Sequence, residues 1–172
     1  MNKAISRKEF LRSSLITAAG LIITPNMLAA GVQDKPPAIS PEIVSQFVRV
    51  AHFDFDKLKQ MLQEHPLLLN SAWDWGGGDF ETAMNAAGHM GLKETAEYLL
   101  TKGARADIFA LTMLGKTEIV KRILKDYPVL LNSLGPHGFT LLHHAEQGGK
   151  DSEELLKYLQ DLGLKEKKVS LF

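Results

Sequence analysis

Two segments of this 172-residue chain are nearly the same, and this internal repeat constrains the fold more than any other feature. Residues 58–71 (LKQMLQEHPLLLNS) align with residues 120–133 (VKRILKDYPVLLNS) at an offset of 62, with seven of the fourteen positions identical. Two helical hairpins of about thirty residues each would produce such an offset. A single hairpin cannot bury its apolar face alone, so the repeat predicts a stack in which neighbouring hairpins cover one another.

The chain between the two copies carries a related motif. Residues 81–104 read ETAMNAAGHMGLKETAEYLLTKGA, and residues 139–145 (FTLLHHA) restate its opening. This pattern resembles the ankyrin repeat, whose consensus runs from Thr-Pro-Leu-His-x-Ala-Ala through Gly-His to Gly-Ala. The segments 53–62 and 115–124 resemble further, partial copies of its second helix. The resemblance covers about residues 42–163 and implies an all-α, ankyrin-like solenoid of about four helical hairpins with short irregular fingers.

Several positions of the repeat have a structural role in this interpretation. The threonine hydroxyls are placed to cap helices, and the glycines between amphipathic stretches allow the left-handed backbone that a reversal needs. By resemblance to the family, the histidine ties neighbouring loops together through hydrogen bonds. These positions are Thr82, Gly91, Gly103, Gly115, Thr140, His143 and Gly149.

The spacing of the turns departs from the family period of about 33 residues. Successive turn positions lie 38, 24 and 34 residues apart. The middle junction is too short for a projecting finger, so the chain is expected to pass from Gly103 almost directly into a helix near Ile108. Two fingers remain, one containing residues 73–79 and the other covering residues 132–138.

The first 31 residues have the arrangement of an export signal, with basic residues before a mild apolar run and small residues after it. The residues Ser6, Arg7, Lys8, Phe10 and Leu11 resemble the twin-arginine motif, with lysine in place of the second arginine. The apolar run is too short and too weak to span a membrane. We therefore expect cleavage and a periplasmic or otherwise exported protein of a bacterium, by the twin-arginine or the general secretory route.

The remaining domain boundaries follow from composition. Residues 32–41 are proline-rich and predict an extended linker, because proline fixes its own backbone and restricts its predecessor. The repeat domain is expected over residues 42–165, and a tail over residues 166–172.

Charge and cysteine content exclude several function classes. The formal net charge is zero, so no basic field exists to gather nucleic acid or an anionic membrane. The absence of cysteine excludes disulfides, thiol nucleophiles and thiolate metal ligands. We expect a monomer that recognises an unidentified protein or peptide, and the co-export of that partner is a further hypothesis.

Function is expected where the repeat pattern is broken. Two tryptophans flank an aspartate in the first finger, ahead of three glycines and a second carboxylate. Broad amphipathic rings beside acidic acceptors are suited to a protein or peptide partner, although either ring could instead fold back and seal the first repeat. The predicted binding residues are Trp73, Asp74, Trp75, Asp79, His89, Met113 and His137, with Met113 equally suited to the core.

The alternative function is a small-molecule binder or a hydrolase that uses Asp74, Asp79 and His137 at a pocket beside the first finger. Ser133, Asp126 and His137 supply the residue types of a hydrolytic triad, but no nucleophile-elbow pattern surrounds the serine. The neighbours His143 and His144 point to different sides of a helix and cannot chelate one ion. The sequence therefore assigns no catalytic residue, no metal ligand and no cofactor.

Overall fold

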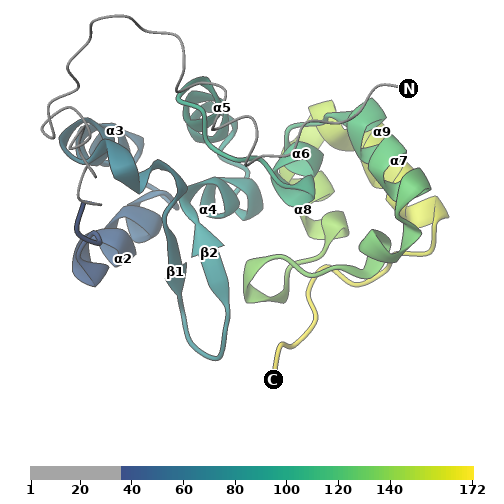
Figure 1. Ribbon diagram of the computed structural model, residues 1–172. Coiled ribbons are helices and arrows are strands. Elements are labelled where there is room, and N and C mark those ends of the chain that lie inside the picture. The colour runs from purple at the N-terminus through teal and green to yellow at the C-terminus, as the bar shows by residue number, and fades with distance from the viewer. Residues whose placement is uncertain (1–35) are drawn as a thin grey trace, which may run out of the picture. The chain divides into compact units, whose positions relative to one another are not determined.

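The structure is a computed structural model that describes residues 36–172, so the predicted signal peptide and its export motif lie outside the described residues. The described part is mostly helical, in agreement with an all-α class, and it contains one small two-stranded sheet (Figure 1). None of the helices in this part combines the length and apolar character that crossing a membrane requires.

The helices follow one another in pairs. The first members of successive pairs contact each other in a row, and each second member packs on its own partner (Figure 1). The first members are α2 (Pro41–Val50), α4 (Ala83–His89), α6 (Ile108–Met113) and α8 (Leu141–Gly148). The second members are α3 (Phe55–Glu64), α5 (Lys93–Thr101), α7 (Thr117–Asp126) and α9 (Glu153–Asp161).

The sequence repeat is also a structural repeat. Helices α3 and α7 have the same length at an offset of 62, and each leads into a short 3₁₀ helix, η2 (Pro66–Asn70) or η3 (Pro128–Asn132). Each α-helix ends because the residue before a proline is driven out of the helical region. His65 and Tyr127, which occupy that position, have nearly identical backbone angles of −134°/76° and −133°/73°.

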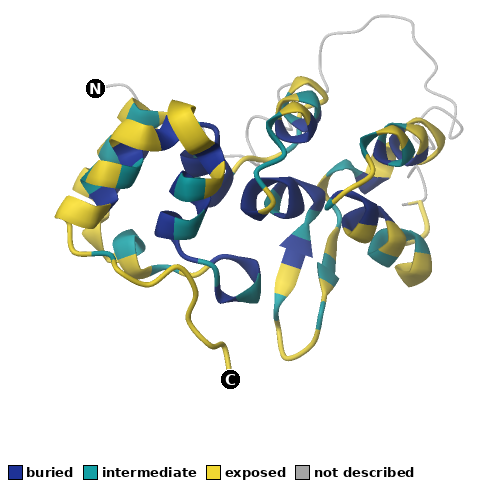
Figure 2. Cartoon of the chain, turned by 180° about the vertical axis from the view of Figure 1, so that it is seen from behind, coloured by how far each residue is buried: buried dark blue, intermediate teal, exposed yellow. Residues whose placement is uncertain are grey.

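Small side chains allow the first row of helices to pack closely. The buried alanines on α4, α6 and α8 leave no bulk between neighbouring backbones, and the faces that meet there are buried (Figure 2). Larger residues complete two core clusters, one on each side of α6. The alanines are Ala83, Ala86, Ala87, Ala110 and Ala145.

The predicted caps and turns are confirmed at most positions. The Thr82 hydroxyl accepts a hydrogen bond from the amide of Asn85, and the Asn85 side-chain oxygen accepts one from the amide of Thr82, so this helix start is a capping box. Gly115 has φ of 64°, and a Cβ at this position would collide with the carbonyl of Asp151. The other predicted turn glycines also have positive φ: Gly91, Gly103 and Gly149.

The remaining two predicted structural side chains, His143 and Thr140, both form hydrogen bonds to backbone carbonyls. His143 links two successive repeats, but through helices rather than loops, because its Nε2 atom on α8 lies 2.9 Å from the carbonyl oxygen of His89 at the end of α4. Thr140 precedes α8, but the prediction of a side-chain cap is wrong there, since its hydroxyl donates to the carbonyl of Glu166 instead. The C-terminal tail, which lies alongside, therefore takes the hydroxyl away from the helix.

The first finger contains a β-hairpin, which the helical prediction did not include. Strands β1 (Ala72–Asp74) and β2 (Phe80–Thr82) are antiparallel, with Trp73 opposite Glu81. The Asp74 carboxylate accepts the amides of Gly76 and Gly78, which orders the glycine-rich connection.

The second finger contains η4 (Pro136–Gly138) and is covered by the C-terminal tail. The amide of Val169 donates to the carbonyl of Gly138, and the amide of Thr140 donates to the carbonyl of Lys167. These bonds hold the tail beside the finger, and the tail is part of the surface that the fingers form.

Candidate binding site at the two fingers

Four titratable side chains meet at the base of the fingers, and we call them the histidine cluster: His52, Glu81, His89 and His137. His52 follows α2, Glu81 lies on β2, His89 ends α4 and His137 lies on η4. One potential ligand atom from each residue lies within 4.8 Å of the corresponding atoms of the others. Residues that are up to 85 positions apart in the chain are therefore brought to one point.

Glu81 is the centre of the cluster. Its side chain is 0% exposed, and its Oε1 atom lies 2.8 Å from Nε2 of His89. Its Oε2 atom lies 3.4 Å from Nε2 of His52 and 3.5 Å from Nε2 of His137, and it accepts the indole N–H of Trp75 at 2.7 Å. Alternation along the hairpin explains the last contact, because Trp73, opposite Glu81, and Trp75 point to the same face.

The surroundings of Glu81 keep it ionised. Burial alone would raise its pKa, but the hydrogen bonds from His52, His89 and Trp75, together with the charge of His52, lower the pKa of Glu81 to about 2. Burial likewise opposes protonation of His52, but the hydrogen bond and negative charge of Glu81 outweigh it and raise the pKa of His52 above its ordinary value. The buried carboxylate is thus held in its negative form by the donors around it.

His137 is held in an unusual backbone conformation. Its φ is 59°, and it is the only residue other than glycine with positive φ in residues 36–172. Asp79 accepts both the backbone amide of His137, at 2.8 Å, and its ring Nδ1–H, at 2.7 Å. A left-handed conformation is costly for a side chain of this kind and is often found at functional positions. The first finger therefore sets the direction in which this imidazole points.

Aromatic rings and one arginine enclose the cluster. The ring of Phe139 stacks on His89 with centroids 5.1 Å apart, and Trp75 meets His52 edge to face at 6.2 Å. The guanidinium of Arg49 lies 5.3 Å from the centre of the Trp75 ring. These contacts fix the imidazole rings and hold the indole against the carboxylate.

The structure brings together part of the predicted binding set. Trp75, Asp79, His89 and His137 meet at the cluster, where the rings of His89 and His137 lie 5.4 Å apart. Met113 is wrong as a partner-binding residue, because it is 0% exposed and belongs to the core.

The other predicted residues of the first finger lie around the cluster. Trp73 is half-buried on β1, opposite Glu81, while the exposed Asp74 organises the glycine connection. His89 is buried, so it cannot reach a macromolecular partner directly.

Sequence reasoning missed His52 and Glu81. His52 stands at the end of a helix in the copy that lacks a turn glycine, and Glu81 was read only as the residue before a capping threonine. The one available signal for Glu81 was a carboxylate two residues from Asp79, at the alternation expected of a strand. Nothing in the sequence places His52 beside it.

Only part of the residue set of the alternative hydrolytic function comes together, namely the pair of Asp79 and His137. The Ser133 hydroxyl donates to the carbonyl of Leu130, and the Asp126 carboxylate pairs with Arg122. Asp79 is occupied by His137, and Asp74 by the glycine amides. The described residues therefore contain no arrangement of these groups that resembles a triad.

The tips of the fingers and the tail expose apolar side chains, which we call the finger surface. The ring of Phe172, 86% exposed, lies against Gly77 of the hairpin, while Leu171 lies beside Gly138 of the second finger. Leu134 and Val169 line one cavity of about 400 Å³. The members of the finger surface are Phe80, Leu134, Val169, Leu171 and Phe172.

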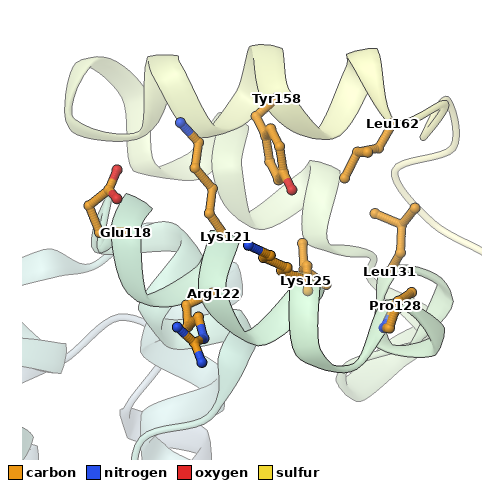
Figure 3. A pocket seen from close by; sticks show the side chains of 9 residues that line it. Glu118, Lys121, Arg122, Lys125, Pro128, Leu131, Tyr158 and Leu162 are labelled. Carbon is orange, nitrogen blue, oxygen red and sulfur yellow. The ribbon is translucent and has the colours of Figure 1, made fainter.

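A separate cavity of about 510 Å³ lies between α7 and α9, and Figure 3 shows the side chains that line it. Leu131, Leu162 and the Tyr158 ring supply apolar surface. Two of its basic residues have acidic partners, since Lys121 pairs with Glu154 and Arg122 pairs with Asp126, while Lys125 also lines it.

Comparison of the chain with protein-family models, curated proteins and solved structures returned no match. The ankyrin resemblance consequently rests on the residues of this chain alone.

Proposed function

We propose that this chain is an exported interaction module, an ankyrin-like solenoid that binds a protein or peptide partner through its finger surface. The order of the helix pairs, the positive φ of the glycine turns and the His143 tie support the solenoid. The export signal remains a prediction from the first 31 residues, and it would put the partner in the periplasm or outside the cell.

The observation that carries the proposal is the exposed apolar side chains at the fingertips. Phe80 is 61% exposed, and the tail adds the more exposed Phe172 on the neighbouring glycine connection. Monomeric proteins rarely leave apolar side chains gathered in this way unless the patch meets a partner. The histidine cluster beneath them fixes the two fingers, so the surface is preorganised for binding.

A photo-crosslinking amino acid at position 80 or 172 tests the proposal in cells that produce the protein. Both positions should give a discrete adduct with the same partner, because both belong to one surface. Position 129 is the matched control, since Val129 is 78% exposed but lies on η3, outside the finger surface. Equal adducts at positions 80 and 129, or none at 80 and 172, would refute the interaction.

The substitution Phe80→Ser provides a second measurement. It removes exposed apolar surface without touching the core, so folding should be unchanged while the yield of the adduct from position 172 falls several-fold. Circular dichroism checks the fold of the variant. An unchanged adduct yield would show that Phe80 has no part in recognition.

A further inference from the structure

We propose that the histidine cluster is a binding site for one divalent transition-metal ion, with zinc as the reference ion, ligated by the imidazoles of His52, His89 and His137 and by the Glu81 carboxylate. This inference goes beyond the proposed interaction and does not depend on it. It concerns the base of the fingers, where the described residues gather three imidazoles around one buried carboxylate.

The distances within the cluster match the edges of a small coordination shell. The Nε2 atoms of His52 and His89 lie 3.2 Å apart, and three imidazole-to-carboxylate distances are 2.8, 3.4 and 3.5 Å. A tetrahedral ion with ligands at about 2.0–2.2 Å has ligand atoms about 3.3–3.6 Å from one another. The 2.8 Å distance involves Oε1 of Glu81 and the other two involve Oε2, and all four ligand atoms lie within 4.8 Å of one another, so the side chains have to adjust around an ion without leaving the cluster.

The outer hydrogen bonds orient two of the imidazoles as metal ligands. Nδ1 of His52 lies 3.0 Å from the carbonyl oxygen of Val48, which can only accept, so this ring nitrogen carries the hydrogen. Nδ1 of His137 donates to the Asp79 carboxylate. When these two rings are neutral, as metal ligation requires, the Nε2 lone pair of each points into the cluster. Carbonyl and carboxylate partners of this kind are the usual supports of metal-bound histidines.

When His52 and His137 are neutral, the cluster contains more inward acceptors than inward hydrogens. Trp75 donates to one carboxylate oxygen of Glu81, and His89 can supply one inward hydrogen. The Nε2 atoms of His52 and His137 lie 3.4 and 3.5 Å from the same carboxylate oxygen of Glu81. A cation at the centre satisfies these acceptors at once and offsets the buried negative charge of Glu81.

The donor set determines the class of ion. Three imidazole nitrogens and one carboxylate suit zinc and its first-row neighbours, whereas calcium and magnesium require shells made mainly of oxygen. The single negative charge of Glu81 also leaves a net positive charge on the complex with a divalent ion. The ion would join α2, β2, α4 and η4, and it would hold His137 of the second finger to three ligands from the first half of the chain.

Isothermal titration of the untagged, metal-free chain with Zn²⁺ tests the site. One equivalent should bind, and His52→Gln and His137→Gln should each weaken binding by at least about 100-fold. Asp79→Asn removes only the support of His137 and should weaken it by about 10- to 100-fold. His65→Gln is the control, because His65 is exposed at the end of α3, outside the cluster, and the affinity of this variant should stay within a few-fold.

A second measurement does not depend on any variant. Co²⁺ bound by nitrogen and oxygen ligands in a tetrahedral shell absorbs visible light, and one equivalent should produce this spectrum and be displaced by Zn²⁺. Far-UV circular dichroism confirms that the variants fold. If the unmodified chain neither binds Zn²⁺ nor gives the Co²⁺ spectrum, or if folded His52→Gln and His137→Gln bind as tightly as His65→Gln, the proposal is wrong and the cluster is a hydrogen-bonded network without metal. Both measurements use the chain alone, so they do not depend on whether a partner binds the finger surface.

Discussion

The two halves of the domain share a backbone pattern but differ in what they place at the fingers. An offset of 58 residues aligns Thr82 with Thr140 and Gly91 with Gly149, and it puts Phe139 and Gln147 at the positions of Glu81 and His89. The offset of 62 puts the buried Leu114 at the position of His52. The second half therefore has apolar or neutral side chains where the first half has the cluster. Repetition specifies the frame, and the differences between copies specify the chemistry.

The largest effect is expected from removing the Glu81 carboxylate, since the equivalent position in the second half is the uncharged Phe139. Glu81→Ala should lower the free energy of unfolding by about 3–5 kcal/mol, because it leaves the donors of Trp75 and His89 without their buried acceptor. Urea denaturation with a chelator present measures the effect without metal.

Glu154→Ala is the control for this substitution. Glu154 is an exposed carboxylate that pairs with Lys121, so its loss should cost at most about 1 kcal/mol. Similar losses for the two variants would mean that the Glu81 carboxylate is not a central element of the first half.

The two halves should also differ in how their stability depends on pH. The second half buries a titratable residue, His144, at the position where the first half has Ala86. Burial lowers the pKa of His144 to about 4, and its Nδ1 donates to the carbonyl of Thr140. The unfolded chain binds this proton near pH 6.5, whereas the folded chain does not until about pH 4. The part of the free energy of unfolding that depends on neutral His144 is therefore at its full value above pH 6.5. It should fall by about 3 kcal/mol as the pH decreases to 4.

Denaturation curves of His144→Asn between pH 7 and pH 4 isolate this residue. The variant should be less stable at pH 7, because its smaller side chain leaves a void, but its stability should depend less on pH than that of the unmodified chain. His65→Asn alters an exposed histidine and should retain the original dependence. A pH dependence unaffected by His144→Asn would contradict the assignment.

The smallest expected difference concerns the equivalent threonines Thr82, which caps α4, and Thr140, which binds the tail instead. Thr82→Val should cost about 1 kcal/mol and accelerate amide hydrogen exchange at Asn85, the amide that the hydroxyl accepts. Thr140→Val should instead accelerate exchange in the tail at Val169, since its hydroxyl holds the carbonyl of Glu166. Amide exchange can be measured by NMR. If Thr82→Val accelerated exchange only in α4 and Thr140→Val only in α8, the different roles of the two threonines would be refuted.

The helical frame could be predicted from the sequence because its signals are local. The proline at residue 41 begins α2, the motif around Thr82 forms a capping box, and the helix expected near Ile108 begins at that residue. The β-hairpin could not be predicted in the same way. Its strands have three residues each, which is too short for alternation to be distinguished from a loop.

The candidate site was only half predictable. Trp75, Asp79 and His137 stood out because they interrupt the repeat, whereas His52 and Glu81 lie inside segments that the repeat already explained. Met113 shows the reverse error, because position along the chain does not reveal which side of a six-residue helix faces the core. Only the stacking of the helices brings the ends of α2 and α4 to the same place as the fingers.

The two hydrogen bonds between Asp79 and His137 make the role of each residue depend on the presence of the other. One carboxylate fixes both the backbone amide and the ring of a residue whose left-handed conformation it helps to maintain. Glycine in place of His137 would relax the turn but would remove the imidazole. A neutral residue at position 79 would remove the carboxylate that orients the imidazole through a hydrogen bond. Descendants of this chain that retain one of the two residues should therefore retain the other.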